Sequence, residues 1–353
     1  MSAALTRPED FIGAGLADPR DRAALAAVAA RYSAAMSPRL AALARAHPQI
    51  ARQYAPDARE LTVLPQERAD PIGDDAHSPV AGLVHRYPDR VLLKIVSACP
   101  VYCRFCFRRE SVGAGRGAMD GEAIAAALDY LRGNEQVWEV ILTGGDPFVL
   151  SPRRLAALAS DISSIPHIKI LRLHTRAPMA SPELVTREFI AALQSTRLAV
   201  YVAVHANHPA EFDAPAKAAL AQLADAGVGL VSQSVLLRGV NDDVETLEAL
   251  MRAFVEARVK PYYLHHPDLA PGTGHFRLSL DEGRALYAAL CARVSGLARP
   301  AYVLDIPGGA GKIPVAESAL RREGDTWRAR DAAGRAHDYA DPADAAGKPD
   351  SRD

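Results

Sequence analysis

The chain between residues 91 and 307 alternates short apolar segments with longer amphipathic ones. The apolar segments are rich in β-branched and aromatic residues, which is typical of buried strands. They cover residues 91–98, 137–145, 168–175, 198–206, 229–237, 260–267 and 300–307. The segments between them repeat apolar residues at helical spacing and predict helices over 120–134, 151–165, 181–195, 213–226, 243–257 and 279–294. Strands that alternate with helices in this way pair in parallel through right-handed crossovers.

Seven such strands fit a partial or full (β/α) barrel better than an open nucleotide-binding sheet, because the turn after the first strand holds cysteines and no glycine-rich phosphate loop. We therefore predict an α/β fold with three parts. Residues 1–84 form a helical or irregular N-terminal extension, in which Ser37 caps a helix that starts at Pro38. Residues 85–318 form the barrel. Residues 319–353 form a hairpin over the turn at 332–334, followed by a disordered tail over 343–353.

Composition excludes several classes of function. Of 353 residues, 49% are hydrophobic and 24% are charged, the balance of a soluble folded protein. The net charge of −1 gives no reason to expect a nucleic-acid partner. No apolar run approaches the ~20 residues that span a bilayer. The N-terminus also lacks a signal peptide, so we expect a cytoplasmic protein without a membrane partner.

Three of the four cysteines lie close together, in the turn after the first barrel strand. Cys99, Cys103 and Cys106 form the pattern C-x3-C-x2-C. Three thiolates can hold a [4Fe-4S] cluster and leave one iron open, whereas a structural zinc needs a fourth ligand that residues 95–115 do not offer. Buried filler and a cytosolic disulfide fit the spacing less well. Cys291, in an apolar helical stripe, is interpreted as a small buried hydrophobic residue.

This cysteine pattern, with Tyr102 and Phe105 beside it, resembles the radical S-adenosylmethionine (SAM) superfamily. The resemblance implies that SAM binds the open iron and is cleaved to a 5′-deoxyadenosyl radical. Seven motifs, in order over residues 70–315, are similar to the lysine 2,3-aminomutase family: HRYPDRVLL, YCRFCFRR, LTGGDPFVL, VHANHP, SQSVLLRGVND, PYYLHHPDLAPGTGHFR and YVLDIPGGAGKIPV. They imply a radical SAM enzyme with pyridoxal 5′-phosphate (PLP). Such an enzyme interconverts L-lysine and β-lysine by 1,2-migration of the α-amino group.

Lys312 is the candidate for binding PLP. It lies in PGGAGKIP, where glycines leave the amine accessible, and a desolvated lysine can form a Schiff base with PLP. A phosphate-binding P-loop does not fit, because Ile306 and Ile313 replace residues that such a loop requires. By resemblance Lys312 is the PLP lysine, and Arg86, Tyr87 and Arg90, placed just before the first strand, bind the phosphate. Without the resemblance, a surface salt-bridge cluster is the better interpretation of the arginines.

The resemblance assigns SAM contacts to the ends of three strands. Gly144 and Gly145 would approach the methionyl amine, and Asp146 could accept a hydrogen bond from an ammonium, although GGD alone is also typical of a tight turn. His205 and Gln233 resemble contacts to the ribose and adenine. His205 and His208 form H-x-x-H, but no carboxylate motif nearby supports zinc.

Three further residues would bind the substrate. By resemblance Arg108 pairs with the lysine carboxylate, and Asp268 and Asp305 pair with its ε-ammonium. Either aspartate alone could be a helix cap or a surface charge, but together they would balance a buried ammonium. Glutamate-specific relatives replace these carboxylates, so lysine is the expected substrate. The cysteines, Gly144, His205, Asp268 and Asp305 fall at or beyond the C-terminal ends of predicted strands, where barrels place their chemistry.

The chain departs from the family at its C-terminus. Some members carry a cysteine group there for a structural zinc, but no cysteine follows Cys291, so we expect no zinc and leave open whether the chain is a homo-oligomer. An electron donor such as flavodoxin or ferredoxin is implied. Alternative functions are a β-lysine-forming enzyme that serves elongation factor P, although that branch often lacks the counterpart of Asp305, and an aminomutase for arginine or glutamate. A non-enzymatic iron–sulfur electron carrier is a further alternative.

Overall fold

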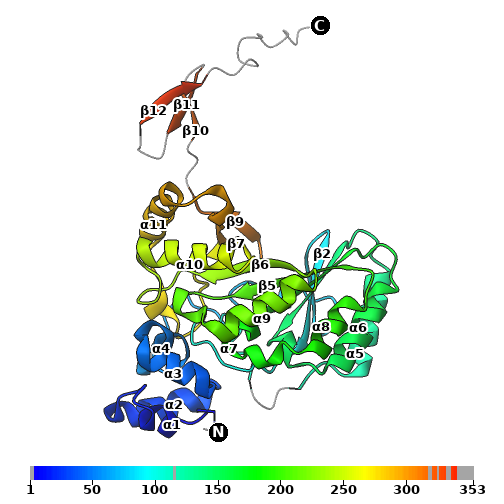
Figure 1. The fold of residues 1–353 in the computed structure, drawn as a ribbon, viewed down its shortest axis with the longest axis horizontal. Coiled ribbons are helices and arrows are strands. Elements are labelled where there is room, and N and C mark those ends of the chain that lie inside the picture. The colour runs from blue at the N-terminus through cyan, green and yellow to red at the C-terminus, as the bar shows by residue number, and fades with distance from the viewer. Residues whose placement is uncertain (1–3, 114–116, 317–319, 324–325, 331–334, 340–353) are drawn as a thin grey trace.

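The computed structural model of the chain describes residues 4–113, 117–316, 320–323, 326–330 and 335–339. Its centre is a nine-stranded sheet in which the strands lie side by side in sequence order (Figure 1). The strands are β1 (Leu83–Tyr87), β2 (Arg90–Val96), β3 (Glu139–Gly144), β4 (Ile170–Thr175), β5 (Ala199–His205), β6 (Gly229–Val235), β7 (Lys260–His265), β8 (Ala301–Ile306) and β9 (Gly311–Pro314). Strands β2 to β8 pair in parallel, and the two edge strands pair antiparallel with their neighbours.

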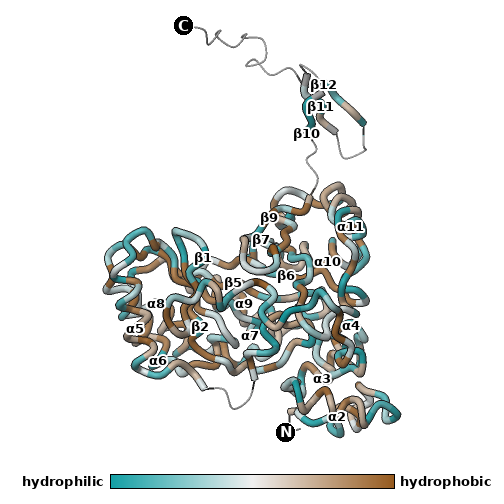
Figure 2. The backbone as a smooth tube through the Cα atoms, turned by 180° about the vertical axis from the view of Figure 1, so that it is seen from behind, coloured by the Kyte–Doolittle hydropathy of each residue, from teal (hydrophilic) through white to brown (hydrophobic). Residues whose placement is uncertain are grey.

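Helices connect the parallel strands and pack around the sheet: α5 (Gly121–Arg132), α6 (Pro152–Ser163), α7 (Ala177–Ala180), α8 (Arg187–Gln194), α9 (Ala214–Asp225), α10 (Val244–Glu256) and α11 (Leu280–Arg293). Their starting points follow from local chemistry. Asp120 caps α5 by accepting from the backbone N–H of Ala123 at 2.8 Å, as the sequence predicts. The core between helices and sheet is one continuous apolar cluster, and hydrophobic stretches gather there in Figure 2.

The N-terminal extension contains α1 (Pro8–Gly13), α2 (Arg22–Arg31), α3 (Pro38–Ala46) and α4 (Pro48–Tyr54). Ser37 caps α3 as predicted, accepting from the N–H of Leu40. Helices α1, α3 and α4 contribute to a second apolar cluster, which includes Phe11, Leu40 and Tyr54. At the other end of the chain, β10 (Leu320–Glu323), β11 (Thr326–Arg330) and β12 (Ala336–Tyr339) form a small antiparallel sheet, which Figure 1 shows apart from the barrel.

The structure confirms the predicted α/β barrel as a partial one and confirms all seven predicted strands. Two edge strands were not predicted. Arg86, Tyr87 and Arg90 were placed before the first strand, which is wrong because Arg86 and Tyr87 lie within β1 and Arg90 is the first residue of β2. Charged residues in β1 and the glycine and proline of β9 hide the apolar pattern of both strands. The hairpin of β11 and β12 matches the prediction, whereas its turn at 332–334 and the tail over 343–353 lie outside the described residues.

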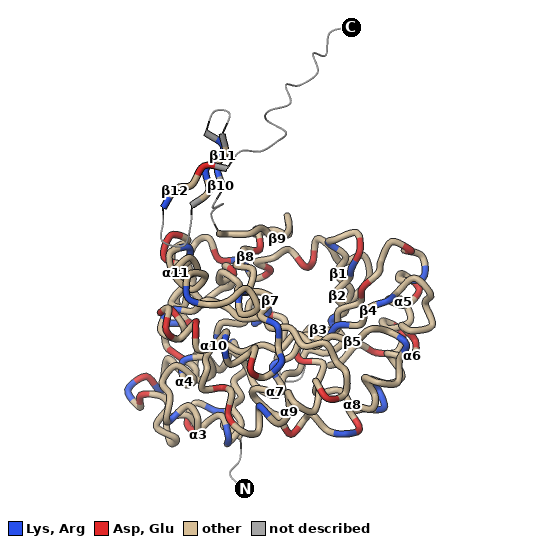
Figure 3. The backbone as a smooth tube through the Cα atoms, turned by 45° about the horizontal axis from the view of Figure 1, so that its top comes forward, with Lys and Arg blue, Asp and Glu red and all other residues tan. Residues whose placement is uncertain are grey.

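The opening between the two edge strands is bridged by a side chain. Among the described residues β1 and β9 form no ladder with each other, but the backbone N–H of Lys312 on β9 donates to the Tyr87 hydroxyl on β1 at 2.8 Å. In the described part of the chain, no helix is long and apolar enough to cross a membrane. Positive and negative residues are interspersed over the molecule (Figure 3).

Candidate active site

One cavity of about 290 Å³ lies among the barrel strands, and every residue predicted to belong to the site lines it. These residues are Arg86, Tyr87, Arg90, Cys99, Cys103, Cys106, Arg108, Gly144, Gly145, Asp146, His205, Gln233, Asp268, Asp305 and Lys312. They come from segments up to 226 positions apart in the chain, from Arg86 to Lys312. The parallel strands β2 to β8 point their carboxyl ends at the same rim, which brings the cysteines, Gly144, His205 and Asp305 together. Arg86 and Tyr87 come from the antiparallel edge strand β1, and Lys312 comes from the antiparallel edge strand β9.

The three clustered cysteines follow β2 and are free thiols that face the same cavity. Burial raises the pKa of each thiol, to about 11 for Cys103. Thiols bind metals as thiolates, so metal binding here must displace protons. No three His, Cys, Asp or Glu side chains in the described ranges are placed to hold a single metal ion. A four-iron cluster instead takes one thiolate on each of three irons.

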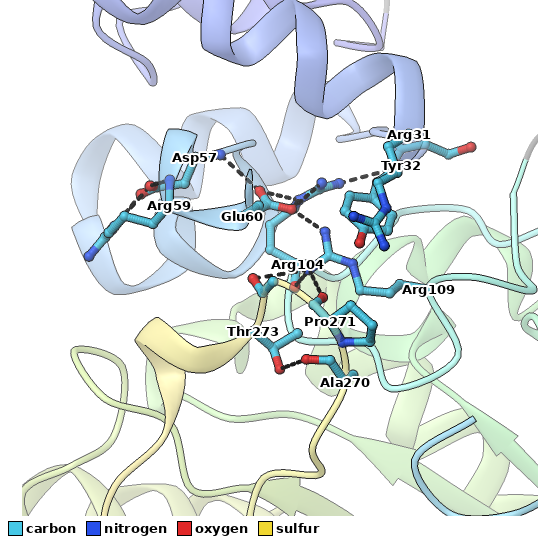
Figure 4. Close-up of polar contacts among 12 residues, drawn as sticks. Arg31, Tyr32, Asp57, Arg59, Glu60, Arg104, Arg109, Ala270, Pro271 and Thr273 are labelled. Atoms are coloured by element: carbon cyan, nitrogen blue, oxygen red, sulfur yellow. Dashed lines mark hydrogen bonds and ion pairs between the residues drawn. The ribbon is translucent and has the colours of Figure 1, made fainter. Parts of the chain in front are cut away.

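A buried carboxylate from the N-terminal extension holds the cysteine loop, and the sequence did not predict it. Glu60, which is fully buried, pairs with Arg104, two positions before Cys106, and with Arg109, three positions after it (Figure 4). Arg104 Nε lies 2.9 Å from Glu60 Oε1, and Arg104 also donates to the carbonyl of Ser33 at 2.8 Å. The Arg109 guanidinium lies 3.6 Å from the centre of the Tyr32 ring. The extension therefore fixes the conformation of the predicted cluster loop.

A second buried network surrounds Arg176, which directly follows β4. Its guanidinium donates to Glu211 Oε2 at 2.8 Å and to Gln53 Oε1 at 2.5 Å, and lies 3.1 Å from His205 Nδ1. Although burial opposes its charge, Glu211 raises the pKa of Arg176 above its ordinary value. Arg176 is also a positive charge close to Cys103, whose pKa it lowers against the effect of burial. No periodic pattern or motif in the sequence pointed to this arginine.

The two glycines at the end of β3 lie against the backbone that leads into the cysteine loop. Gly144 has φ +110°, and a Cβ there would be 2.3 Å from the Val96 carbonyl oxygen. A Cβ on Gly145 would be 2.1 Å from the Ala98 carbonyl oxygen. Asp146, next in the chain, accepts from Thr175 Oγ1 at 2.7 Å and from the N–H of Arg176 at 2.8 Å. This stretch thus joins the ends of β2, β3 and β4.

His205 and Gln233 are cross-strand partners on β5 and β6, which are the fourth and fifth of the predicted strands. The Phe105 ring stacks on His205 with centroids 5.8 Å apart. Gln233 Nε2 lies 3.4 Å from His174 Nε2. Burial, followed by the charge of Arg176, lowers the pKa of His205 well below its ordinary value, so its imidazole is neutral at physiological pH.

Two predicted anion-binding arginines share one buried carboxylate that was not predicted. Asp74 Oδ1 lies 3.2 Å from Arg86 Nη2, and Asp74 Oδ2 lies 2.9 Å from Arg108 Nε. Arg108 also donates to Thr143 Oγ1 at 3.3 Å. Among the described residues, Arg86 Nε is buried without a hydrogen-bond partner. Asp74 therefore fixes the spacing between two guanidinium groups that the sequence assigned to different ligands.

Lys312 lies on β9 directly opposite Asp305 on β8. Its Nζ bonds Asp305 Oδ2 and lies 3.4 Å from His265 Nδ1 on β7. Although burial opposes ionisation, His265 and Lys312 lower the pKa of Asp305 to about 2. The glycine turn before Lys312 is anchored by the extension, since His77 Nε2 lies 3.1 Å from the Gly309 carbonyl oxygen.

Asp268, after β7, has a different environment from Asp305. Burial, reinforced by the nearby Asp305 carboxylate, raises the pKa of Asp268 to about 7. Two carboxylates of one cavity thus differ in protonation near neutral pH. Asp305 is ionised and pairs with Lys312, whereas Asp268 becomes charged only near pH 7. A cation bound beside Asp268 would favour its ionised form.

The residues present fit the groups that the sequence implies. Three free thiols line one wall and suit an iron–sulfur cluster. A lysine amine faces the cavity, and the buried, unpartnered Nε of Arg86 suits an anionic group such as a phosphate. The carboxylates of Asp268 and Asp305 line the same cavity, which suits a cation, and Asp305 bonds that amine.

The radical SAM superfamily model matches residues 93–251 of the chain. The chain is 41% identical to L-lysine 2,3-aminomutase of Clostridium subterminale over 266 residues, which cover 75% of this chain and 64% of that protein. A protein of Treponema pallidum, provisionally named L-lysine 2,3-aminomutase, is 41% identical over 276 residues, covering 76% of this chain and 77% of that protein.

Glutamate 2,3-aminomutase of Clostridioides difficile is 36% identical over 259 residues, covering 73% of this chain and 61% of that protein. The chain spans less than two thirds of the length of the first relatives, at 61 to 64%. Among solved structures, a radical SAM methyltransferase of Sphaerobacter thermophilus is 21% identical with a TM-score of 0.44, covering 63% of this chain and 68% of that one.

Proposed function

Because the chain belongs to the lysine 2,3-aminomutase family, we propose that it interconverts L-lysine and β-lysine by 1,2-migration of the α-amino group, using a [4Fe-4S] cluster, SAM and PLP. The observation that carries the proposal is the shared cavity. Cysteines, a lysine amine, arginines and two carboxylates from distant parts of the sequence face one space of about 290 Å³. An electron carrier alone has no need of the amine and the carboxylate pair.

The roles proposed for the residues follow from their chemistry. Cys99, Cys103 and Cys106 would hold the cluster, and Gly144, Gly145, Asp146, His205 and Gln233 would contact SAM. Lys312 would bind PLP, with its phosphate on Arg86, Tyr87 and Arg90. When bound, the cluster with SAM supplies a radical that removes hydrogen, and PLP supplies the aldehyde carbon that carries the migrating nitrogen.

The chain's own residues would orient the amino acid from both ends. Arg108 would pair with the substrate carboxylate, held in place by Asp74 at 2.9 Å. Asp268 and Asp305 would accept the ε-ammonium. This supports lysine over glutamate, because a second carboxylate would meet like charges there. Since burial raises the pKa of Asp268 to about 7, lysine should bind more tightly as the pH rises through that value.

The test is turnover of the anaerobically reconstituted protein with lysine, SAM, PLP and dithionite, followed by chiral analysis of the product. We expect β-lysine, and we expect Lys312→Ala to abolish its formation. SAM cleavage without β-lysine would contradict the proposed substrate. A panel containing arginine and glutamate then identifies any other amino acid that is a substrate. A role in elongation factor P modification is tested separately, by asking whether the product is a substrate of a lysyl-transferase-like ligase.

The remaining expectations belong to the same proposal. Reduction of the cluster requires a low-potential donor, for which flavodoxin or ferredoxin is the expected class. The free thiols suit the reducing cytoplasm. Whether the chain forms a homo-oligomer is measured on the full chain by light scattering.

A further inference from the structure

We propose that His265 is the proton acceptor for Lys312 and thereby makes the lysine amine nucleophilic. The inference rests on the proposed function, in which Lys312 binds PLP. It concerns a residue to which neither the sequence patterns nor the comparisons give a role. His265 lies at the end of β7 and lines the cavity.

The geometry places His265 against both members of an ion pair. Its Nδ1 lies 3.4 Å from Lys312 Nζ and 3.5 Å from Asp305 Oδ2. An ammonium that is paired with a carboxylate has no free electron pair, so it cannot attack an aldehyde. The proton of Lys312 must therefore leave before the amine can form a bond to carbon.

Two side chains beside Lys312 Nζ could accept its proton, the Asp305 carboxylate and the His265 imidazole. Asp305 is a poor acceptor, because the groups beside it, among them the Lys312 ammonium, lower its pKa to about 2 against the effect of burial. A neutral imidazole has a lone pair for the proton, and burial lowers the pKa of His265, so it is neutral at physiological pH.

The proposed step conserves charge. The proton moves from Lys312 Nζ to His265 Nδ1, and the electron pair of the N–H bond stays on Nζ. The ion pair of Lys312 with Asp305 becomes an ion pair of His265 with Asp305, so no charge is left uncompensated in the cavity. Other titratable groups that face or influence His265 are Tyr263 on its own strand, with ring centroids 5.5 Å apart, and His174 and His205 across the cavity.

The experiment starts from the full chain freed of PLP and measures the rate at which it binds added PLP covalently. Absorbance monitors the reaction, and the mass after borohydride trapping confirms the covalent bond. We expect His265→Gln to slow capture at neutral pH at least about tenfold, because positioned proton transfer contributes ~10²–10⁴-fold. The difference in rate between this variant and the wild type should shrink as the pH rises, since hydroxide then deprotonates Lys312 without help. The matched control is His266→Gln. His266 is also buried, but it lies 2.8 Å from Tyr302 Oη, so its substitution should leave the rate of PLP capture unchanged.

Two results would overturn the inference: a His265→Gln variant with the wild-type rate and pH profile, or equal slowing by both glutamine variants. If His265→Gln fails to fold, His265→Ala is measured with added imidazole, which should restore the rate. Absence of rescue would count against proton transfer. Failure of the wild type itself to capture PLP on Lys312 would instead overturn the proposed function, so the two failures are distinguishable.

Discussion

Gly145 is a residue whose missing side chain shapes the site. A Cβ at this position would lie 2.1 Å from the Ala98 carbonyl oxygen, a backbone atom that cannot move without shifting the cysteine loop. We expect Gly145→Ala to lower the free energy of unfolding by about 2 kcal/mol or more and to reduce the iron bound after reconstitution.

The matched control is Gly121→Ala at the first position of α5, where an added Cβ would meet no heavy atom within 4 Å. That variant should change stability by less than about 1 kcal/mol. Urea unfolding monitored by circular dichroism compares the two. Equal stabilities would contradict the close-packing interpretation of Gly145.

Asp268 gives a pH dependence at the residue scale. Its pKa rises from 3.8 in the unfolded chain to about 7 in the ligand-free fold. The folded state therefore holds the proton more tightly, and this contribution to stability is complete below pH 3.8 and lost as the pH rises through 7. We expect Asp268→Asn to exceed the wild type in stability at pH 8, by up to about 4 kcal/mol, and to lose this advantage near pH 4. Urea unfolding across this pH range measures the difference, and a pH-independent difference would contradict the assignment.

At the scale of elements, Glu60 connects the N-terminal extension to the loop after β2. Removing it leaves Arg104 and Arg109 buried without their carboxylate. We expect Glu60→Ala to cost about 3–5 kcal/mol in the free energy of unfolding. Glu9→Ala is the control, because its pair with Arg22 is exposed and should contribute about 0–1 kcal/mol. Similar losses for both variants in chemical denaturation would contradict the special role of Glu60.

At the scale of the whole molecule, we propose that the barrel and the extension fold independently of β10 to β12. The last barrel residues are held locally, since Val315 N–H donates to the Tyr302 carbonyl at 2.9 Å and Arg284 Nε donates to the Val315 carbonyl at 3.0 Å. A chain that ends after residue 316 should keep its thermal midpoint within about 4 °C of the full chain and still capture PLP. A larger fall in calorimetry would show that the small sheet stabilises the barrel.

Much of the barrel and its chemistry could be predicted because the signals are local. Apolar periodicity indicated seven strands and their helices, and motif spacing indicated the cysteines and Lys312. Residues such as Glu60, Asp74 and Arg176 carried no such signal. Each acts on a partner that is distant in sequence: Glu60 on Arg104, Asp74 on Arg86 and Arg108, and Arg176 on Gln53 and Glu211.

The sequence by itself determined the order of strands and helices, the cysteine triplet and the lysine, because hydrophobic period and ligand spacing are properties of neighbouring residues. The tertiary structure decided which charges are neutralised. It set Asp305 against Lys312 and left Asp268 with a raised pKa. It also placed His265 beside both members of that ion pair. Burial and distance between remote groups control these properties, and both exist only after the strands have assembled.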